Sequence, residues 1–336
     1  MAPNGAPHVG GLPFGGGRYV KVSLISTVKD AGAHVGEFLA SVRTQTRPPD
    51  EVVIVDGGST DGTWERLRAE PGIHALREPG AGIGRGRNVA IRAAAHDLIA
   101  VTDADCLLEP DWLEHLVEPV ERGTADVAAG FYRPLATSLF EVVSAAVSVP
   151  ERDELDRGWM PSSRSVAFRR EVFDAAGGYP EWLEVGEDMY FNHRLRESGA
   201  RFELAPDAVA WWRVRPTLAA TWRQYARYSE GDALAGMYPH RHALRFGVYA
   251  GAAFALATRR RSLLTAAALG GAAYAWKPLR RTWTRLAVAP ERRPAAVAMV
   301  APMMAFVDAA KMWGYARGLL VLRGTRGRVA PAEDRA

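Results

Sequence analysis

The chain has 336 residues, 48% of them hydrophobic and 24% charged, which is enough to bury a core in one large or two modest domains. The formal net charge of +4 fits an anionic ligand or a membrane surface. No basic stripe carries interleaved aromatic residues, so we expect no nucleic acid partner. Cys106 is the only cysteine, which excludes a disulfide within the chain and favours a reducing compartment.

The first third of the chain alternates strand-like and helix-like segments. Residues 1–17 are rich in Gly and Pro and lack the apolar segment of a signal peptide, so we expect a flexible tail there. The alternation that follows predicts a doubly wound, Rossmann-like α/β sheet. Strands are predicted over 19–27, 51–56, 72–77 and 99–101, and helices over 33–44 and 87–95.

Three polar side chains, Thr27, Asp56 and Asp103, fall where predicted strands end. Ligands of doubly wound sheets bind beyond the carboxyl ends of the strands, so this coincidence predicts a binding site at that edge. Asp103 and Asp105 are two residues apart, which on an extended chain puts both carboxylates on one side. Such a pair can hold Mg²⁺ or Mn²⁺, which in turn holds phosphate oxygens. The alternative is a polar turn after a buried strand.

The middle of the chain continues the mixed pattern. Glu187 and Asp188 form an acidic pair that opens a helix, and Gly199 ends it. Further strands are predicted over 125–131 and 165–168, short edge segments over 202–204 and 209–212, and helices from 112 and over 135–149, 170–176 and 217–230.

The C-terminal part consists of apolar segments rich in Ala and Gly. Segments 246–258 and 262–276 are split by three consecutive arginines and are shorter than the ~20 residues that a clean membrane span needs. Segment 295–322 is long enough only with Asp308 and Lys311 included. Helices that are apolar all round need lipid or one another. We therefore expect short or re-entrant helices, or a hairpin, at a membrane; the alternative is a helical cap packed on the α/β domain.

Six short motifs follow one another in the α/β region: residues 22–30, Asp56-Gly57-Gly58-Ser59, Gly86-Arg87-Asn88, Asp103-Ala104-Asp105, Gly186-Glu187-Asp188 and Gln224-Tyr225-Ala226-Arg227-Tyr228. In this order and spacing they resemble the motifs of the family-2 glycosyltransferases, inverting enzymes with the GT-A fold, here of a bacterial membrane-associated type. The resemblance covers roughly residues 20–230. The chain departs from the family pattern at Gly57, where a second Asp is common, and at Tyr228, where the family has Trp.

The resemblance implies a nucleotide-diphosphate sugar as donor, with UDP, GDP and dTDP all left open, and a divalent cation, Mg²⁺ or Mn²⁺. Asp105 would coordinate the cation directly, and Asp103 would be shared between the cation and the ribose. The residues implied in binding the nucleotide sugar are Thr27, Asp30, Asp56, Gly58, Arg87, Asn88, Asp103 and Ala104.

The same resemblance implies that Asp188 is the general base that deprotonates the acceptor hydroxyl, while Glu187 orients it or binds acceptor. The alternative for Asp188 is a helix cap. The acceptor is expected to be lipid-linked or a polysaccharide. Four further residues are expected to contact the acceptor or the diphosphate, with ordinary packing as their alternative: Gln224, Arg227, Tyr228 and Trp211. Two interpretations stay open for Arg164, Arg169 and Arg170: they face phosphate, or they are ordinary surface residues.

These observations predict a GT-A domain over 18–242 and a membrane-associated helical region over 243–325, followed by a tail over 326–336. We expect the protein at the cytoplasmic membrane with its catalytic domain on the cytoplasmic side. A nucleotidyltransferase of sugar or lipid phosphates is the main alternative, although no basic, Gly-rich loop follows the first strand. A dinucleotide-dependent oxidoreductase is disfavoured because Arg87 stands where a third glycine belongs. A membrane scaffold without catalysis is disfavoured by the intact acidic residues.

Overall fold

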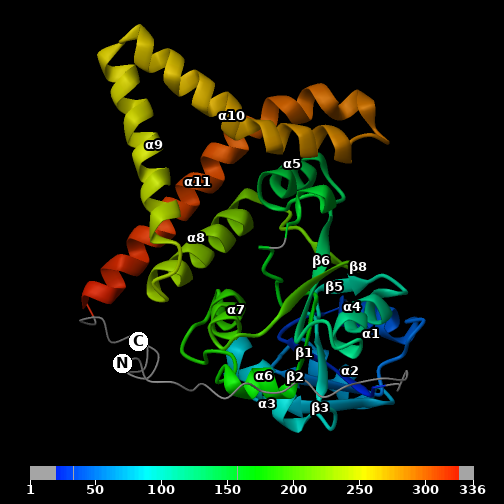
Figure 1. The fold of residues 1–336 in the computed structure, drawn as a ribbon. Coiled ribbons are helices and arrows are strands. Elements are labelled where there is room, and N and C mark those ends of the chain that lie inside the picture. The colour runs from blue at the N-terminus through cyan, green and yellow to red at the C-terminus, as the bar shows by residue number, and fades with distance from the viewer. Residues whose placement is uncertain (1–19, 33, 157, 325–336) are drawn as a thin grey trace.

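An eight-stranded mixed sheet forms the centre of the α/β part of the protein (Figure 1). The computed structural model describes residues 20–32, 34–156 and 158–324, so the two predicted tails lie outside the described residues. The strand order is β3-β2-β1-β4-β7-β6-β8-β5. The strands are β1 (Val22–Val28), β2 (Glu51–Asp56), β3 (Ile73–Arg77), β4 (Leu98–Val101), β5 (Cys106–Leu108), β6 (Val127–Leu135), β7 (Val166–Arg169) and β8 (Phe202–Arg213).

The first four strands pair in parallel, as the alternation of strands and helices predicts. The other half of the sheet differs, because β7 runs antiparallel to both β4 and β6. The prediction of two short edge segments at 202–204 and 209–212 is wrong: β8 is one strand that lies between β6 and β5. A register shift at Gly130/Phe131 accommodates its interrupted hydrophobic pattern. β5 is not predicted, because three residues are too few to show a period.

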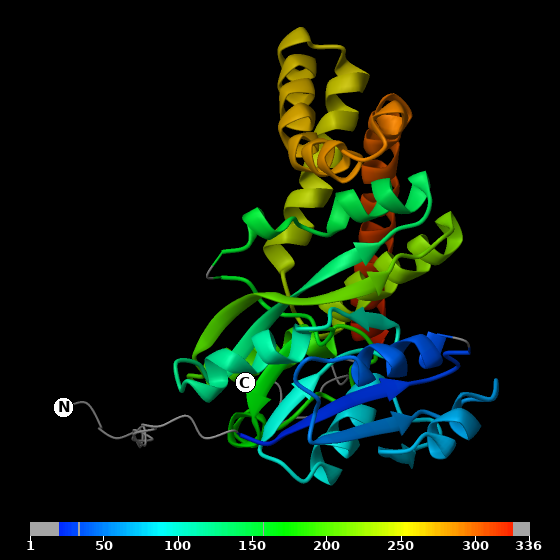
Figure 2. The ribbon, with the colours of Figure 1, turned by 90° about the vertical axis from the view of Figure 1, so that its right-hand side faces the viewer.

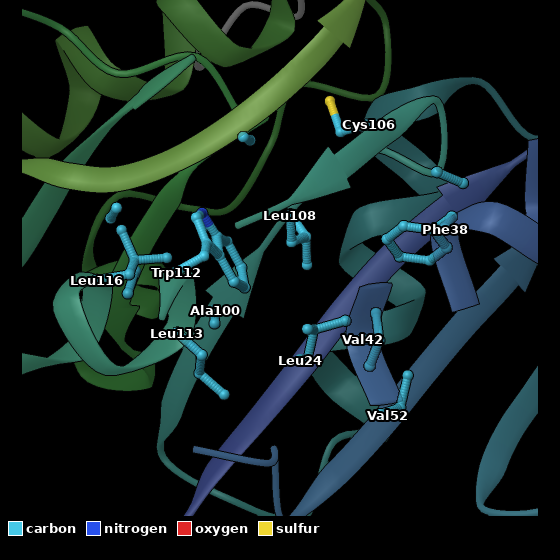
Figure 3. Packing of buried hydrophobic residues seen from close by; sticks show 14 of the residues in the cluster. Leu24, Phe38, Val42, Val52, Ala100, Cys106, Leu108, Trp112, Leu113 and Leu116 are labelled. Carbon is cyan, nitrogen blue, oxygen red and sulfur yellow. The ribbon is translucent and has the colours of Figure 1, made fainter. Parts of the chain in front are cut away.

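Helices cover both faces of the sheet, and successive strand residues supply the two cores. Leu24 belongs to the core under α1 and α4, whereas Ile25 belongs to the core under α3, α6 and α7. Figure 3 shows the first core, in which Trp112 is fully buried and its indole N–H donates to Ser165 Oγ at 2.8 Å. The helices are α1 (His34–Arg43), α2 (Thr63–Ala69), α3 (Ile83–Ala93), α4 (Trp112–Glu121), α5 (Leu139–Ser148), α6 (Arg170–Ala175) and α7 (Glu187–Glu197), with a 3₁₀ turn at Arg152–Glu154.

The remaining helices form a second unit beside α5. The junction of α9 and α10 lies far from the sheet in both views (Figures 1 and 2), α11 packs along α8, and a third apolar cluster joins α5, α8, α10 and α11. Within the described residues one helical stretch, Pro290–Gly324, is long and apolar enough to cross a membrane, with a mean hydropathy of 1.5. The boundary predicted after residue 242 falls inside α9. These helices are α8 (Leu218–Leu234), α9 (Pro239–Thr258), α10 (Arg261–Arg285) and α11 (Arg293–Gly324), with a 3₁₀ turn at Pro290–Arg292.

Candidate active site

Asp103 and Asp105 lie just past the carboxyl end of β4, where the fully buried strand gives way to a turn. Both side chains are half-buried, and the Ala104 between them is buried. The prediction places the two carboxylates on an extended chain, but residues 104 and 105 form a turn, and it is this turn that keeps the two carboxylates close to each other. The turn is closed by the Cys106 N–H, which donates to the Asp103 carbonyl at 3.0 Å.

Arg87 joins this pair to the acidic residues of α7. Its guanidinium, on α3 and 3% exposed, lies 2.6 Å from Asp103 Oδ1 and 2.5 Å from Glu187 Oε1. Burial alone would lower the pKa of Arg87, but Asp103 and Glu187 raise it above its ordinary value. Asp188 follows directly in the chain, so two acidic groups far apart in sequence come together at one site.

The carboxylates of Asp103 and Asp105 are close enough to influence each other's ionisation. Burial works against the charge on Asp103, but Arg87 and Arg164 outweigh it and lower the pKa of Asp103. Burial, reinforced by the negative charge of Asp103, raises the pKa of Asp105. Burial and the neighbouring Asp103 charge thus both disfavour the ionised form of Asp105, and a cation bound between the two carboxylates would favour it.

Arg164 is a third cation of the site. Its guanidinium lies over the rings of Tyr132 and Trp212, with 5.2 Å and 4.7 Å to the ring centroids, and its Nε is 3.9 Å from Asp103. It also donates to the Tyr228 hydroxyl at 3.4 Å. Of the two sequence interpretations, phosphate-facing or surface, the structure places Arg164 in the site.

Arg215, which the sequence does not single out, approaches the site from the end of β8. Its guanidinium is 3.8 Å from Asp105 Oδ2. The sequence feature that could have identified Arg215 is its position two residues past the end of a strand, because Thr27, Asp56 and Asp103 also lie at strand ends. Arg169 and Arg170 lie at the other end of β4, since Arg169 is in register with Leu98. Arg170 donates to the carbonyls of Ile91, Ala94 and His96 at the end of α3.

Asp188 is held at the start of α7 by backbone donors. Its Oδ1 accepts from its neighbour, the Met189 N–H, at 2.8 Å, and its Oδ2 accepts from the Ser163 N–H at 3.4 Å. Among the described residues it forms no ion pair. Glu187 is engaged by Arg87 instead, and burial, with the neighbouring Asp188 charge, raises the pKa of Glu187.

Helix α8 brings two of its three candidate residues to the site. Gln224 donates to the Tyr228 hydroxyl at 2.8 Å, and Tyr228 in turn meets Arg164. Arg227 pairs instead with the exposed Glu184 at 3.3 Å. Trp211 lies on the other side of β8 from Trp212, and its indole N–H donates to Glu109 at 2.5 Å.

The predicted nucleotide-binding residues fall at the ends of β1 and β2. Asp56 is fully buried and accepts from the N–H groups of Gly58 and Ser59 at 3.2 and 3.1 Å. The Gly58 backbone has φ 92°, a left-handed conformation that suits glycine. The two loops interlock, because the Asp30 N–H donates to Ser59 Oγ at 2.8 Å.

Thr27 and Asn88 contact protein groups near this loop pair. Thr27 packs against Gly86, where a Cβ atom would come within 2.8 Å of the threonine methyl. Asn88 donates to the Tyr179 carbonyl and to Glu181, both at 2.9 Å, and accepts from the Tyr179 N–H. The side-chain amide of Asn88 is therefore hydrogen-bonded to the turn that precedes α7.

Comparison with known proteins defines the class. The family model described as Glycosyl transferase family 2 matches residues 23–145. The protein shares its fold with the mannosyltransferase PcManGT from Pyrobaculum calidifontis, solved with GDP-Man and Mn²⁺. The TM-score is 0.53 at 23% sequence identity, and the match covers 91% of this chain and 87% of PcManGT. S. aureus TarS 1–349 gives a TM-score of 0.50 at 18% identity, over 91% and 92% of the two chains. The protein is a glycosyltransferase enzyme of the GT-A fold.

A second family model assigns the chain more specifically. The model described as Glycosyl transferase family 21 matches residues 88–332, nearly three quarters of the chain, and the protein belongs to this family. It is 26% identical over 215 residues to glycosyltransferase AglE of Haloferax volcanii, covering 61% of this chain and 68% of AglE. It is 28% identical over 221 residues to the succinoglycan biosynthesis protein ExoA of Rhizobium meliloti, covering 60% and 66%. The nucleotidyltransferase and oxidoreductase alternatives are thereby set aside.

Proposed function

We propose that the enzyme transfers a sugar from a nucleotide-diphosphate donor to an acceptor hydroxyl, with inversion at the anomeric carbon. One observation carries this proposal: Arg87 contacts both Asp103 and Glu187, so the donor-side aspartates and the acidic pair of α7 border one site. A single displacement needs stabilisation of the leaving group on one side of the sugar and a base on the other. The two acidic clusters supply these two sides.

Asp103 and Asp105 fit a divalent cation. They offer hard oxygen ligands, and their mutual repulsion favours a positive charge between them. Among the described residues no group of three or more His, Cys, Asp or Glu side chains is placed to hold a metal ion, so Asp103 and Asp105 are the two protein ligands proposed. A bound Mg²⁺ or Mn²⁺ would offset the charge that develops on the departing diphosphate.

The arginines of the site extend this charge stabilisation. Arg164 lies over two aromatic rings and near Asp103, so its guanidinium is preorganised for a phosphate oxygen. Arg215 stands beside Asp105. The nucleoside end of the donor would lie along the ends of β1 and β2, near Thr27, Asp30, Asp56 and Gly58, with Ala104 and Asn88 closing the site.

Asp188 is the proposed general base. Its carboxylate accepts the proton of the acceptor hydroxyl while the oxygen attacks the anomeric carbon, and the bond to the diphosphate breaks. Glu187 orients Asp188 through its fixed contact with Arg87. Gln224 and Tyr228 border the acceptor side, and Arg227 and Trp211 are more peripheral candidates for acceptor contact.

The acceptor is proposed to be lipid-linked or a growing polysaccharide. The relative ExoA carries the name succinoglycan biosynthesis protein, and the apolar C-terminal helices of this chain suit an acceptor at a membrane. The proposed location is the cytoplasmic membrane, with the active site on the cytoplasmic side.

A thermal-shift panel tests the donor side of this proposal. UDP, GDP and dTDP are added with and without Mn²⁺, and we expect one nucleotide to raise the Tm in a metal-dependent manner, following binding linkage. Asp105→Asn should abolish the metal-dependent part of the shift, whereas Asp174→Asn, an exposed carboxylate on α6, should keep it. Equal shifts with and without metal for every nucleotide would contradict the proposed cation site.

A further inference from the structure

The helices α9 and α10 form a hairpin whose outer part is apolar and almost unburied. Figures 1 and 2 both place the α9–α10 junction far from the sheet. Val248, Phe254, Leu256 and Leu269 are between 57% and 68% exposed, and most of the other residues in segments 250–257 and 266–273 are Ala or Gly. A helix with no polar face is unstable in water unless lipid or protein covers it.

The charges of this region have a single sign. Residues 233–290 contain no Asp or Glu, while Arg259, Arg260 and Arg261 stand together at the turn of the hairpin. Among the described residues none of these three arginines forms an ion pair. In contrast, the arginines at the base of α10 are used within the protein: Arg280, Arg281 and Arg285 pair with Asp153, Glu154 and Glu151 at 2.6 to 2.7 Å.

The hairpin is too short to cross a bilayer. The apolar segments 246–258 and 262–276 are each about 20 Å long as helices, against a hydrocarbon core of about 30 Å. A hairpin inserted along the bilayer normal would leave Arg259–Arg261 inside the hydrocarbon, where arginine is costly. A hairpin tilted within one leaflet, about half as thick, lets these side chains reach the headgroups of the same leaflet.

Helix α11 is not free to cross the bilayer either, although its composition would allow it. A Cβ at Gly314 would overlap the Ala226 carbonyl of α8, and one at Gly318 would meet Ala233, so α8 fills this side of α11. Arg317 of α11 also pairs with Glu230 of α8 at 3.2 Å. Crossing would carry α8, with its polar residues, into the hydrocarbon.

A buried polar cluster joins α9, α10 and α11 and is a second reason why α11 does not cross the bilayer. Asp308 of α11 is 2% exposed and is contacted by Arg245 at 2.9 Å, Tyr249 at 3.1 Å and Tyr274 at 3.0 Å. These contacts join the three helices into one body, and the apolar outside of the hairpin is the surface that no other part of the described chain covers.

We propose that this unit is a one-leaflet membrane insertion: the α9–α10 hairpin lies tilted within a single leaflet, Arg259–Arg261 bind the phosphates of anionic lipids of that leaflet, and α11 does not cross. The inference rests on the proposed membrane association and specifies how it is made. A second copy of the chain is a poorer occupant, because the hairpin of another copy offers no carboxylate to the three arginines.

Vesicle binding by the full-length protein tests the lipid contact. We expect binding to sealed phosphatidylcholine vesicles with 30% phosphatidylglycerol and much weaker binding to pure phosphatidylcholine. Arg259→Gln/Arg260→Gln/Arg261→Gln should weaken binding to the anionic vesicles on the order of a hundredfold. The matched variant Arg43→Gln/Arg66→Gln/Arg68→Gln removes the same charge from the α/β part and should bind like the wild type. Equal loss in both variants, or oligomerisation through the hairpin in place of vesicle binding, overturns the proposal.

Cysteine accessibility tests the topology. Cys106 is buried, so wild-type protein provides an unlabelled background, and Arg260→Cys adds one thiol at the turn. After binding to preformed sealed vesicles, Cys at 260 should react with an impermeant maleimide from outside. Leu269→Cys carrying an environment-sensitive fluorophore should shift to the blue, whereas Glu118→Cys should not. Labelling at 260 only after the vesicles are opened would show a crossing hairpin and refute the proposal.

The donor test separates the two proposals. Nucleotide-dependent Tm shifts are measured on the same arginine variants without vesicles, and they should equal those of the wild type. Failure of the vesicle experiments with intact nucleotide binding removes only the membrane inference.

Discussion

Arg87 is the residue on which the site depends, because it is buried and holds two carboxylates from different elements. The sequence points to Arg87 only through the resemblance of Gly86-Arg87-Asn88, and it cannot show that Glu187 is the second partner, a contact made across 100 residues. The position of Asp103 and Asp105 at the sheet edge is easier to predict, because a strand end followed by two aspartates two residues apart is visible in the sequence itself. Arg215 is missed because a cation after a strand has no distinctive pattern.

Replacing Arg87 by Met should destabilise the fold by about 3–5 kcal/mol, because Asp103 and Glu187 lose their shared partner. The double variant Arg87→Met/Glu187→Gln should recover part of this loss, since it removes one buried charge. The free energy of unfolding in urea, measured for both variants and for each single change, gives the comparison. A double variant that is less stable than Arg87→Met would contradict the account.

The same variant should show a pH dependence of known sign. Burial already raises the pKa of Glu187, and loss of Arg87 raises it further, so the folded state binds a proton more readily than the unfolded state. Because the pKa of Glu187 is already raised to about 7 in the wild type, the Arg87→Met deficit should shrink as the pH falls from about 9 to about 7 and should change little between about 7 and 5. A deficit that is constant from about pH 9 to about pH 7 would show that Glu187 is not the affected group.

Arg164→Gln should weaken donor binding and transfer about tenfold or more, because the guanidinium preorganised over the rings of Tyr132 and Trp212 is lost. The initial rate is measured against donor concentration. Arg122→Gln, which breaks only exposed surface pairs, serves as the control and should leave both parameters unchanged. Wild-type kinetics in Arg164→Gln would exclude a phosphate contact.

At the scale of elements, the parallel strands and their helices follow from local pattern, whereas β8 does not. Its hydrophobic run is broken around Pro206 and Asp207, so the sequence reads as two pieces; pairing with β6 and β5 joins them. The role of α8 is equally non-local. It packs on α11 through Gly314 and Gly318, and its own Gly231 lies against the Val185 carbonyl next to the acidic pair.

Gly314→Ala should therefore lower both the Tm and the transfer rate, because the added Cβ overlaps the Ala226 carbonyl and displaces α8. Gly270→Ala meets no atom within 4 Å and should stabilise α10 by at most about 1 kcal/mol through helix propensity. Thermal unfolding and activity of the two variants are compared. The same effect from both substitutions would contradict the close packing of α8 on α11.

At the scale of the whole molecule, the fold class was predictable from the chain, but the relation of the apolar helices to the site was not. Composition alone indicates three apolar segments. The structure joins them into a unit that contacts α8, and α8 carries Gln224 and Tyr228 to the site. The domain division at residue 242 remains a prediction, and its boundary lies within α9.

The division of labour between the two acidic clusters is tested most directly with Asp188→Asn. The variant is assayed with the nucleotide sugar whose nucleotide gives the metal-dependent Tm shift, and donor binding and transfer are measured separately. Donor binding should stay near wild type, since Asp103, Asp105 and Arg164 are intact, while transfer should fall by about 10² or more because the acceptor keeps its proton. Transfer at the wild-type rate would remove Asp188 as the base and contradict the account.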